Sequence, residues 1–220
     1  MKITPEEKRV RELVREFLVL FYNKGWVSGT GGGLCAALDE THLLIPPTGV
    51  HKERVQPEEL FVVDRENGKV IRSPHNTTLH PSECSPIFCQ IARQRNVGSV
   101  MHSHALSAVL ADDTAMGKDY FLIEGFEMLK GIANENNRTR HFVPVVNNTQ
   151  YERELTQEIA LRLDKTRFAQ AYCLLVRDHG AYIWGRDIWE TKRHAEVYHF
   201  LFEAVVARKK MGIRRDAGPD

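Results

Sequence analysis

Two histidines, His102 and His104, stand two positions apart in a run of residues that is typical of a strand end. Side chains at positions i and i+2 of a strand point to the same face, with their Cα atoms roughly 6.6 Å apart. One metal ion can therefore contact both imidazoles. A third imidazole, His179, follows the apolar run at residues 171–176, and Gly180 after it permits a sharp turn. Three His ligands without a fourth protein ligand are typical of a catalytic zinc that keeps one position open for water or substrate.

The alternative for these histidines is an ordinary packing role. The chain contains ten His, so close pairs occur by chance, and a single His among apolar residues is usually a hydrogen-bonded core or surface group. His102 and His104 alone do not separate the two interpretations. The position of His179 at the end of a second strand-like run favours the metal site.

A glycine-rich run at residues 29–33 holds four glycines in five positions. It lacks the Gly-Lys-Ser/Thr ending of a P-loop, and it precedes strands instead of opening a helix as the dinucleotide-binding fingerprint does. Consecutive glycines expose backbone N–H groups that bind phosphate, although a tight turn without a ligand is an equally good interpretation. Thr48-Gly49 and Ser82, near the start of a predicted helix, carry further hydroxyl and N–H donors for the same anion.

The composition limits the class of protein. With 220 residues, of which 42% are hydrophobic, the chain can bury a core, and we expect one domain over residues 1–220. The 30 basic and 29 acidic residues nearly balance, which favours neither nucleic acid nor a membrane surface as a partner. No apolar stretch approaches the roughly 20 residues of a membrane span and no hydrophobic signal segment begins the chain, so a cytoplasmic location is expected. The four cysteines form no regular framework and are expected as free thiols.

Helical and strand-like segments alternate along the chain. Thr4 is a predicted helix cap followed by Pro5, and apolar residues keep helical spacing to about Asn23. Further helices are predicted at residues 81–95, opening with Ser82, and at 106–111, 151–163 and 189–210. Strands are predicted at residues 34–38, 42–45, 60–64, 97–102, 121–123, 142–146, 171–176 and 181–184. No repeat or linker interrupts this order, which indicates an α/β domain.

Several motifs occur in an order that resembles the class II aldolase superfamily, over about residues 6–210. They are the glycine-rich segment 25–33, Pro47-Thr48-Gly49-Val50, Gln56-Pro57-Glu58, His102-Ser103-His104, Glu127-Met128-Leu129-Lys130-Gly131-Ile132 and Leu175-Val176-Arg177-Asp178-His179-Gly180. The resemblance implies a three-layer α/β/α sandwich around a mainly antiparallel central sheet, and a homotetramer with active sites at subunit interfaces. Within the superfamily, segments 25–33 and 127–132 are most similar to a dehydratase branch.

The same resemblance implies roles for individual residues. His102, His104 and His179 would bind one zinc ion per subunit, and Glu127 would be the catalytic acid/base. The phosphate of the substrate would lie among Gly29, Gly31, Thr48, Gly49 and Ser82, with Lys130 assisting. Without the resemblance, a solvated surface carboxylate would be the ordinary interpretation of Glu127.

One segment departs from the aldolases, which carry a catalytic carboxylate in a Pro-Ser-Ser-Glu motif. Here Pro81-Ser82-Glu83-Cys84 puts a thiol at that position, as the dehydratase branch does, and Glu83 is one position out of register. Cys84 would then contact the substrate; the alternative is a buried small hydrophobic residue. The pair Gly125-Phe126 before Glu127, where polar residues are expected, is a second departure.

The activity implied by the resemblance is a zinc-dependent dehydration. A phosphorylated ketose, 5-methylthioribulose 1-phosphate, would lose its C3 proton and C4 hydroxyl and give 2,3-diketo-5-methylthiopentyl 1-phosphate, a step of methionine salvage. Zinc would polarise the C2 carbonyl, and Glu127 would protonate the leaving hydroxyl. Glu127, Cys84 and a zinc-bound hydroxide all remain acceptors for the C3 proton. The alternatives are a class II sugar-phosphate aldolase or 4-epimerase, and a non-catalytic binding module of the same fold, which the three His disfavour.

Overall fold

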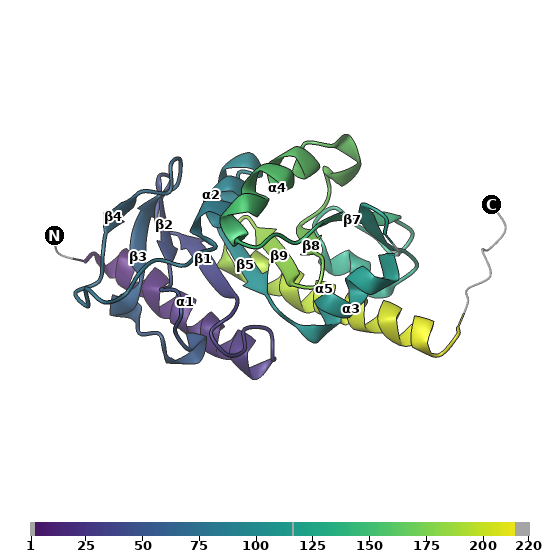
Figure 1. Cartoon of the computed structure of the whole chain (residues 1–220), viewed down its shortest axis with the longest axis horizontal. Helices are drawn as coiled ribbons and strands as arrows, with labels where there is room; N and C mark the ends of the chain where they lie inside the picture. Colours follow the sequence, from purple (N-terminus) through teal and green to yellow (C-terminus); the bar gives the residue numbers. More distant parts are fainter. Residues whose placement is uncertain (1–2, 116, 214–220) are drawn as a thin grey trace.

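Nine strands form one sheet in the computed structural model, which describes residues 3–115 and 117–213 (Figure 1). The strands are β1 Gly33–Ala37, β2 His42–Ile45, β3 Phe61–Asp64, β4 Val70–Arg72, β5 Ser99–Ser103, β6 Tyr120–Ile123, β7 His141–Val146, β8 Cys173–Val176 and β9 Gly180–Gly185. Their order across the sheet is β4-β3-β2-β1-β5-β9-β8-β7-β6. All neighbouring pairs are antiparallel except β7 and β8, which are parallel, so the prediction of a mainly antiparallel sheet is confirmed.

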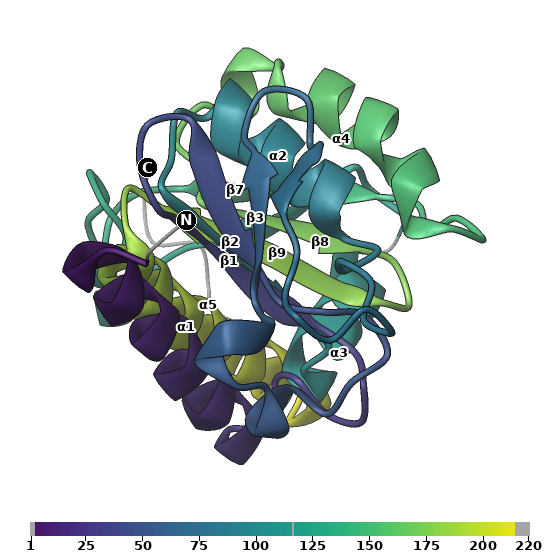
Figure 2. The ribbon, with the colours of Figure 1, turned by 90° about the vertical axis from the view of Figure 1, so that its left-hand side faces the viewer.

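Helices cover both faces of this sheet. They are α1 Pro5–Asn23, α2 Ser85–Gln94, α3 Leu106–Ala115, α4 Leu155–Leu163 and α5 Ile188–Lys210. Figure 2 shows α2 and α4 on one face and α1, α3 and α5 on the other. The buried apolar residues divide in the same way, since Phe17 and Phe202 belong to one cluster and Phe88 and Ile159 to the other. The sheet is therefore buried between two helical layers. The ends of the predicted domain 1–220, together with Met116, lie outside the described residues.

The first helix shows how local signals set the element bounds. Thr4 accepts a hydrogen bond from the Glu7 N–H at 3.1 Å and caps α1, as its position before Pro5 predicts. Phe17 and Phe21, two of the apolar positions with helical spacing, are buried against the sheet. Most of the predicted strands and helices lie within a few residues of the observed ones.

The predicted helix at residues 81–95 is wrong at its start, because α2 begins at Ser85 and not at Ser82. The Ser82 N–H donates to Pro46 O at 3.1 Å, and the Thr48 N–H donates to His80 O at 2.9 Å. These hydrogen bonds keep residues 80–82 extended beside the Pro46–Thr48 segment. A non-local backbone contact therefore overrides the local helix signal and holds Ser82 beside Pro46.

Two further expectations are tested by the fold. No helix in the described ranges is both long enough and apolar enough to cross a bilayer. The four cysteines are free thiols, as predicted, and all of them are buried. Cys84, the residue immediately before α2, lies on the side of the sheet that carries α2 and α4.

Candidate active site

Two neighbouring strands bring the three histidines together. His102 lies in β5 opposite Tyr182 of β9, and the two rings stack with their centroids 4.1 Å apart. His179 lies in the turn between β8 and β9. A Cβ atom at Gly180 would lie 2.0 Å from Ser103 O, so only glycine lets this turn approach β5 so closely.

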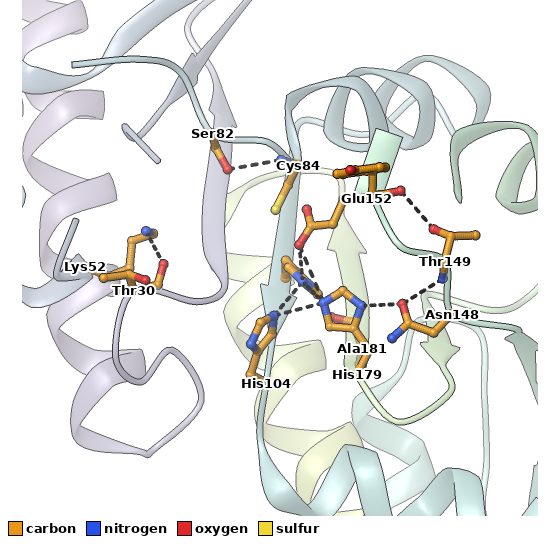
Figure 3. Close-up of polar contacts among 12 residues, drawn as sticks. Thr30, Lys52, Ser82, Cys84, His104, Asn148, Thr149, Glu152, His179 and Ala181 are labelled. Atoms are coloured by element: carbon orange, nitrogen blue, oxygen red, sulfur yellow. Dashed lines mark hydrogen bonds and ion pairs between the residues drawn. The ribbon is translucent and has the colours of Figure 1, made fainter. Parts of the chain in front are cut away.

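The Nε2 atoms of the three histidines converge (Figure 3). The distance is 2.8 Å between His102 and His104, and 3.2 Å between His179 and each of the other two. Three nitrogen ligands bound at about 2.0–2.1 Å to a tetrahedral zinc ion are roughly 3.3–3.4 Å apart. The three imidazoles therefore fit an ion of this size after small shifts.

The remaining ring nitrogens hold two of these imidazoles in place. His102 Nδ1 lies 3.2 Å from Ala181 O, and His179 Nδ1 lies 3.1 Å from the side-chain oxygen of Asn148. Donation from Nδ1 to these oxygens leaves the Nε2 lone pairs directed at the common point. Burial lowers the pKa of His102, and burial with the neighbouring imidazoles lowers the pKa of His104 to about 3. Neutral imidazole is the form that binds a metal ion.

Glu152 is a fourth member of this cluster that the sequence analysis missed. It comes from a 3-10 turn, Glu152–Glu154, before α4, and its Oε1 lies 3.6 Å from His102 Nε2 and 3.5 Å from His179 Nε2. Burial alone raises the pKa of the carboxyl, but hydrogen bonds with His102 and His179 outweigh it and hold the pKa well below its usual range. Its second oxygen is buried and, within the described residues, has no hydrogen-bond partner. His102, His104, His179 and Glu152 thus form a group that can hold a metal ion.

Cys84 interacts with Glu152 of this group, and Ser82 contacts Cys84. Cys84 and Ser82 are both buried, and the Cys84 N–H donates to Ser82 Oγ at 3.3 Å. Figure 3 shows the Cys84 side chain next to the carboxylate of Glu152. Burial raises the pKa of the Cys84 thiol well above its usual range, so the neutral thiol is its resting form. Glu83 is exposed, in agreement with its position out of register.

The glycine-rich loop contacts the site through Gly31. A Cβ atom at Gly31 would lie 2.5 Å from His104 Nδ1, so the loop backbone packs directly against this imidazole. The Gly31 N–H donates to Ser28 O at 3.2 Å and is not a free donor. Gly29 and Gly49 have positive φ angles of 63° and 66° and are exposed. The loop is therefore both a tight turn and a neighbour of the histidines.

Gly31→Ala is expected to weaken zinc binding by about 10- to 100-fold, because the added methyl group displaces the ring of His104. A competition titration of the purified protein with a zinc chelator measures the affinity. Ser28→Ala, at an exposed position of the same loop, is the matched control. Equal zinc affinity in the two variants would show that the loop does not position His104.

Lys52 is a second residue that the sequence analysis missed. Its side chain is buried, with 1% of the residue exposed, and its ammonium group donates to Thr30 O at 2.8 Å and to Val50 O at 3.1 Å. Figure 3 shows Lys52 and Thr30 on the other side of His104 from His179. A Lys next to a charged Glu53 in a polar segment resembles a surface residue, so no local signal identifies it.

Within one chain, Glu127 and Lys130 do not lie next to the three histidines. They lie in a 3-10 turn, Glu127–Gly131, and 69% of the Glu127 side chain and 55% of the Lys130 side chain are exposed. Glu127 contacts Lys130, and its other oxygen accepts from Asn137 at 2.8 Å. The hydrogen bond with Lys130 lowers the pKa of the Glu127 carboxyl. The catalytic role of Glu127 stays a prediction.

Comparison with known proteins places these residues in a family. Residues 12–206 match the family described as Class II Aldolase and Adducin N-terminal domain. The methylthioribulose-1-phosphate dehydratase of Aquarana catesbeiana is 38% identical over 97% of this chain and 90% of its own length. The chain belongs to the methylthioribulose-1-phosphate dehydratase family. With this family it is an enzyme of the lyase class, and its membership of the class II aldolase superfamily is confirmed.

Other members and neighbours show how far this relationship extends. A probable bifunctional methylthioribulose-1-phosphate dehydratase/enolase-phosphatase E1 of Arabidopsis thaliana is 34% identical over 94% of this chain, which spans 43% of that longer protein. Among solved structures, YgbL of Escherichia coli, a putative aldolase/epimerase/decarboxylase, has a TM-score of 0.78 at 20% identity, with 96% of each chain covered. An L-fuculose 1-phosphate aldolase has a TM-score of 0.76 at 17% identity, covering 96% of this chain and 91% of its own. These structures show that this chain has the class II aldolase fold.

Proposed function

We propose that this chain dehydrates 5-methylthioribulose 1-phosphate to 2,3-diketo-5-methylthiopentyl 1-phosphate, in methionine salvage and in the cytoplasm, as one domain over residues 1–220. The observation that carries the proposal is the arrangement of the site: three Nε2 atoms that lie 2.8–3.2 Å apart, beside the thiol of Cys84. This site occurs in a chain that is 38% identical to a named dehydratase. Class II aldolases are expected to carry a carboxylate where this thiol stands. The thiol therefore favours dehydration over C–C bond cleavage.

The histidines and Glu152 define where the substrate reacts. His102, His104 and His179 would hold one zinc ion per subunit, and zinc would supply Lewis acidity at the C2 carbonyl. Among the described residues, Glu152 is the carboxylate that groups with these imidazoles, and its second oxygen is buried without a hydrogen-bond partner. We add it to Glu127 and Cys84 as an acceptor for the C3 proton. The raised pKa of Cys84 keeps its thiol protonated, whereas the lowered pKa of Glu152 keeps its carboxylate ionised and available to accept a proton.

Glu127 would serve the site of a neighbouring subunit in a homotetramer. Its carboxylate is exposed and paired with Lys130, and this pairing favours the ionised form, which has no proton to donate. Burial against a second subunit would raise its pKa and allow it to protonate the leaving C4 hydroxyl. The proposal explains why a residue implied by the family lies apart from the three histidines of its own chain.

The competing activities share the fold and differ in the product. An aldolase of this superfamily would split the carbon chain, a 4-epimerase would leave the mass unchanged, and a binding module would leave the sugar phosphate intact. The clustered imidazoles disfavour the binding module because such a group is suited to hold a metal ion. The likeness to L-fuculose 1-phosphate aldolase concerns the fold alone.

Incubation of the zinc-loaded protein with 5-methylthioribulose 1-phosphate is expected to give a product lighter by about 18 Da, the mass of one water, with an intact carbon chain. Mass spectrometry of the reaction mixture measures this change. Dihydroxyacetone phosphate with an aldehyde fragment would instead establish an aldolase, and an isomer of equal mass would establish an epimerase. The His179→Ala protein, treated in the same way, controls for spontaneous elimination.

A further inference from the structure

Lys52 is a buried cation that the proposed reaction does not yet use. It is the first residue of the 3-10 turn Lys52–Arg54, and 1% of its surface is exposed. Removing an ammonium group from water is costly unless hydrogen bonds and opposite charges compensate for it. A fold that only needed a packed side chain at this position would be more stable with an apolar one. The burial of Lys52 therefore indicates a use for its charge.

The partners of Lys52 connect the two loops that were predicted to bind phosphate. Its ammonium group donates to Thr30 O in the glycine-rich loop and to Val50 O in the loop after Thr48. An ammonium group has three N–H donors, so one remains beyond these two carbonyls. No carboxylate of the described residues lies within ion-pair distance of it, and the charge is balanced only at longer range, by Glu152 and Glu53. The cation thus has one remaining N–H donor and, among the described residues, no direct ion pair.

Unused backbone donors lie in the same two loops. Within the described ranges, the N–H groups of Gly29, Thr30, Gly49 and Val50 donate no hydrogen bond, whereas those of Gly31 and Thr48 are occupied by Ser28 O and His80 O. The positive φ angles of Gly29 and Gly49 turn these short segments sharply, and no atom lies within 4 Å of a Cβ built at either glycine. Free N–H groups around a fixed positive charge are the usual components of a phosphate site.

We propose that Lys52 is the positioning residue of the phosphate site, pinning the glycine-rich loop and the Thr48–Val50 loop together and supplying the positive charge that attracts the phosphate group of the substrate. This inference rests on the proposed function, because it assumes a phosphorylated substrate. It transfers the cationic role from Lys130, which is exposed and paired with Glu127, to Lys52. Gly31 packs against His104 next to Thr30, so the pinned loop also places the phosphate at a fixed distance from the metal ligands.

Lys52→Met keeps the length and apolar stem of the side chain and removes the charge. We expect the affinity for inorganic phosphate, measured by calorimetry on the zinc-loaded protein, to fall about tenfold or more, since a charge-assisted contact and its field are lost. KM for the phosphorylated ketose should rise by a similar factor while kcat and zinc content change little. Lys69→Met, at an exposed position, is the matched control and should bind phosphate as the unaltered protein does.

Several outcomes separate this proposal from its rivals. Unchanged phosphate affinity in folded Lys52→Met protein would overturn it, and so would a fall in kcat or zinc content without a rise in KM, which indicates a purely structural role. If the unaltered protein binds phosphate through Lys52 but releases no water from the ketose, the proposed dehydration fails and the phosphate site stands.

Hydrogen exchange on the unaltered protein tests the same idea if Lys52→Met does not fold. Inorganic phosphate should slow amide exchange at residues 28–31 and 48–51 together, because one cation links both loops. Slowing in only one loop, or in neither, would contradict the proposal.

Discussion

His179→Ala should lose zinc and reduce turnover on the order of 10³-fold or more. Lewis-acid stabilisation at a carbonyl is worth several kcal/mol, and about 1.4 kcal/mol corresponds to a factor of ten in rate. His179 contributes one of three Nε2 atoms that lie 2.8–3.2 Å apart, and two imidazoles with Glu152 would bind the ion more weakly. Elemental analysis of the purified variant and a kcat measurement test this expectation.

The control for His179→Ala is His75→Ala, which removes an exposed imidazole outside the cluster. His179 lies in a turn and 13% of its side chain is exposed, so its removal leaves the apolar core intact. The melting temperature of the metal-free variant should therefore match that of the metal-free parent protein. Full zinc occupancy in His179→Ala would remove His179 from the ligand set.

Glu127→Gln should lower kcat by about two orders of magnitude or more and leave zinc content unchanged, because the amide keeps the size of the side chain and cannot transfer a proton. Zinc is unaffected since Glu127 contacts Lys130 and Asn137 and is not a member of the metal-binding group. Steady-state kinetics with elemental analysis measure both quantities. Glu124→Gln, at a neighbouring exposed carboxylate, controls for a general effect of lost charge.

Mixed assemblies test whether Glu127 acts in a neighbouring subunit. Glu127→Gln and His179→Ala proteins should each be nearly inactive, yet subunits exchanged between them should form some sites with both an intact histidine cluster and an intact Glu127. Activity should then return on mixing to a sizeable fraction of that of the unaltered protein. Proven subunit exchange without any recovery would show that Glu127 acts on the site of its own chain or not at all.

The convergence of the three histidines was predictable in part, because part of their relation is local. His102 lies in β5 and His104 is the first residue after this strand, and the period of two in an extended chain puts both side chains on one face. His179 was predictable for a similar reason, since an apolar strand followed by His-Gly indicates a turn at a sheet edge. The pairing of β5 with β9, which brings His179 to the other two histidines, is a non-local contact. The sequence implied this pairing only through the family resemblance.

The segment at Ser82 shows where local signals fail. Pro81 and Ser82 read as a helix start, yet hydrogen bonds between Ser82 and Pro46 and between Thr48 and His80 keep the chain extended until α2 begins at Ser85. Those partners are more than thirty positions away in the chain. Propensity is a weak prior, and a pair of non-local backbone hydrogen bonds is enough to override it.

The positions of the Glu152 and Lys52 side chains next to the site are determined by the tertiary structure alone. Each is one charged residue among several in a polar segment, and neither has a partner at a helical or strand-like spacing. Glu152 acquires its role because the turn before α4 delivers it to His102 and His179, and Lys52 because two loops close over its ammonium group. Periodicity encodes which face of an element is apolar and which side chains share it. The burial of a single charge depends on contacts between segments distant in the chain, and these exist only once the sheet and its two helical layers have formed.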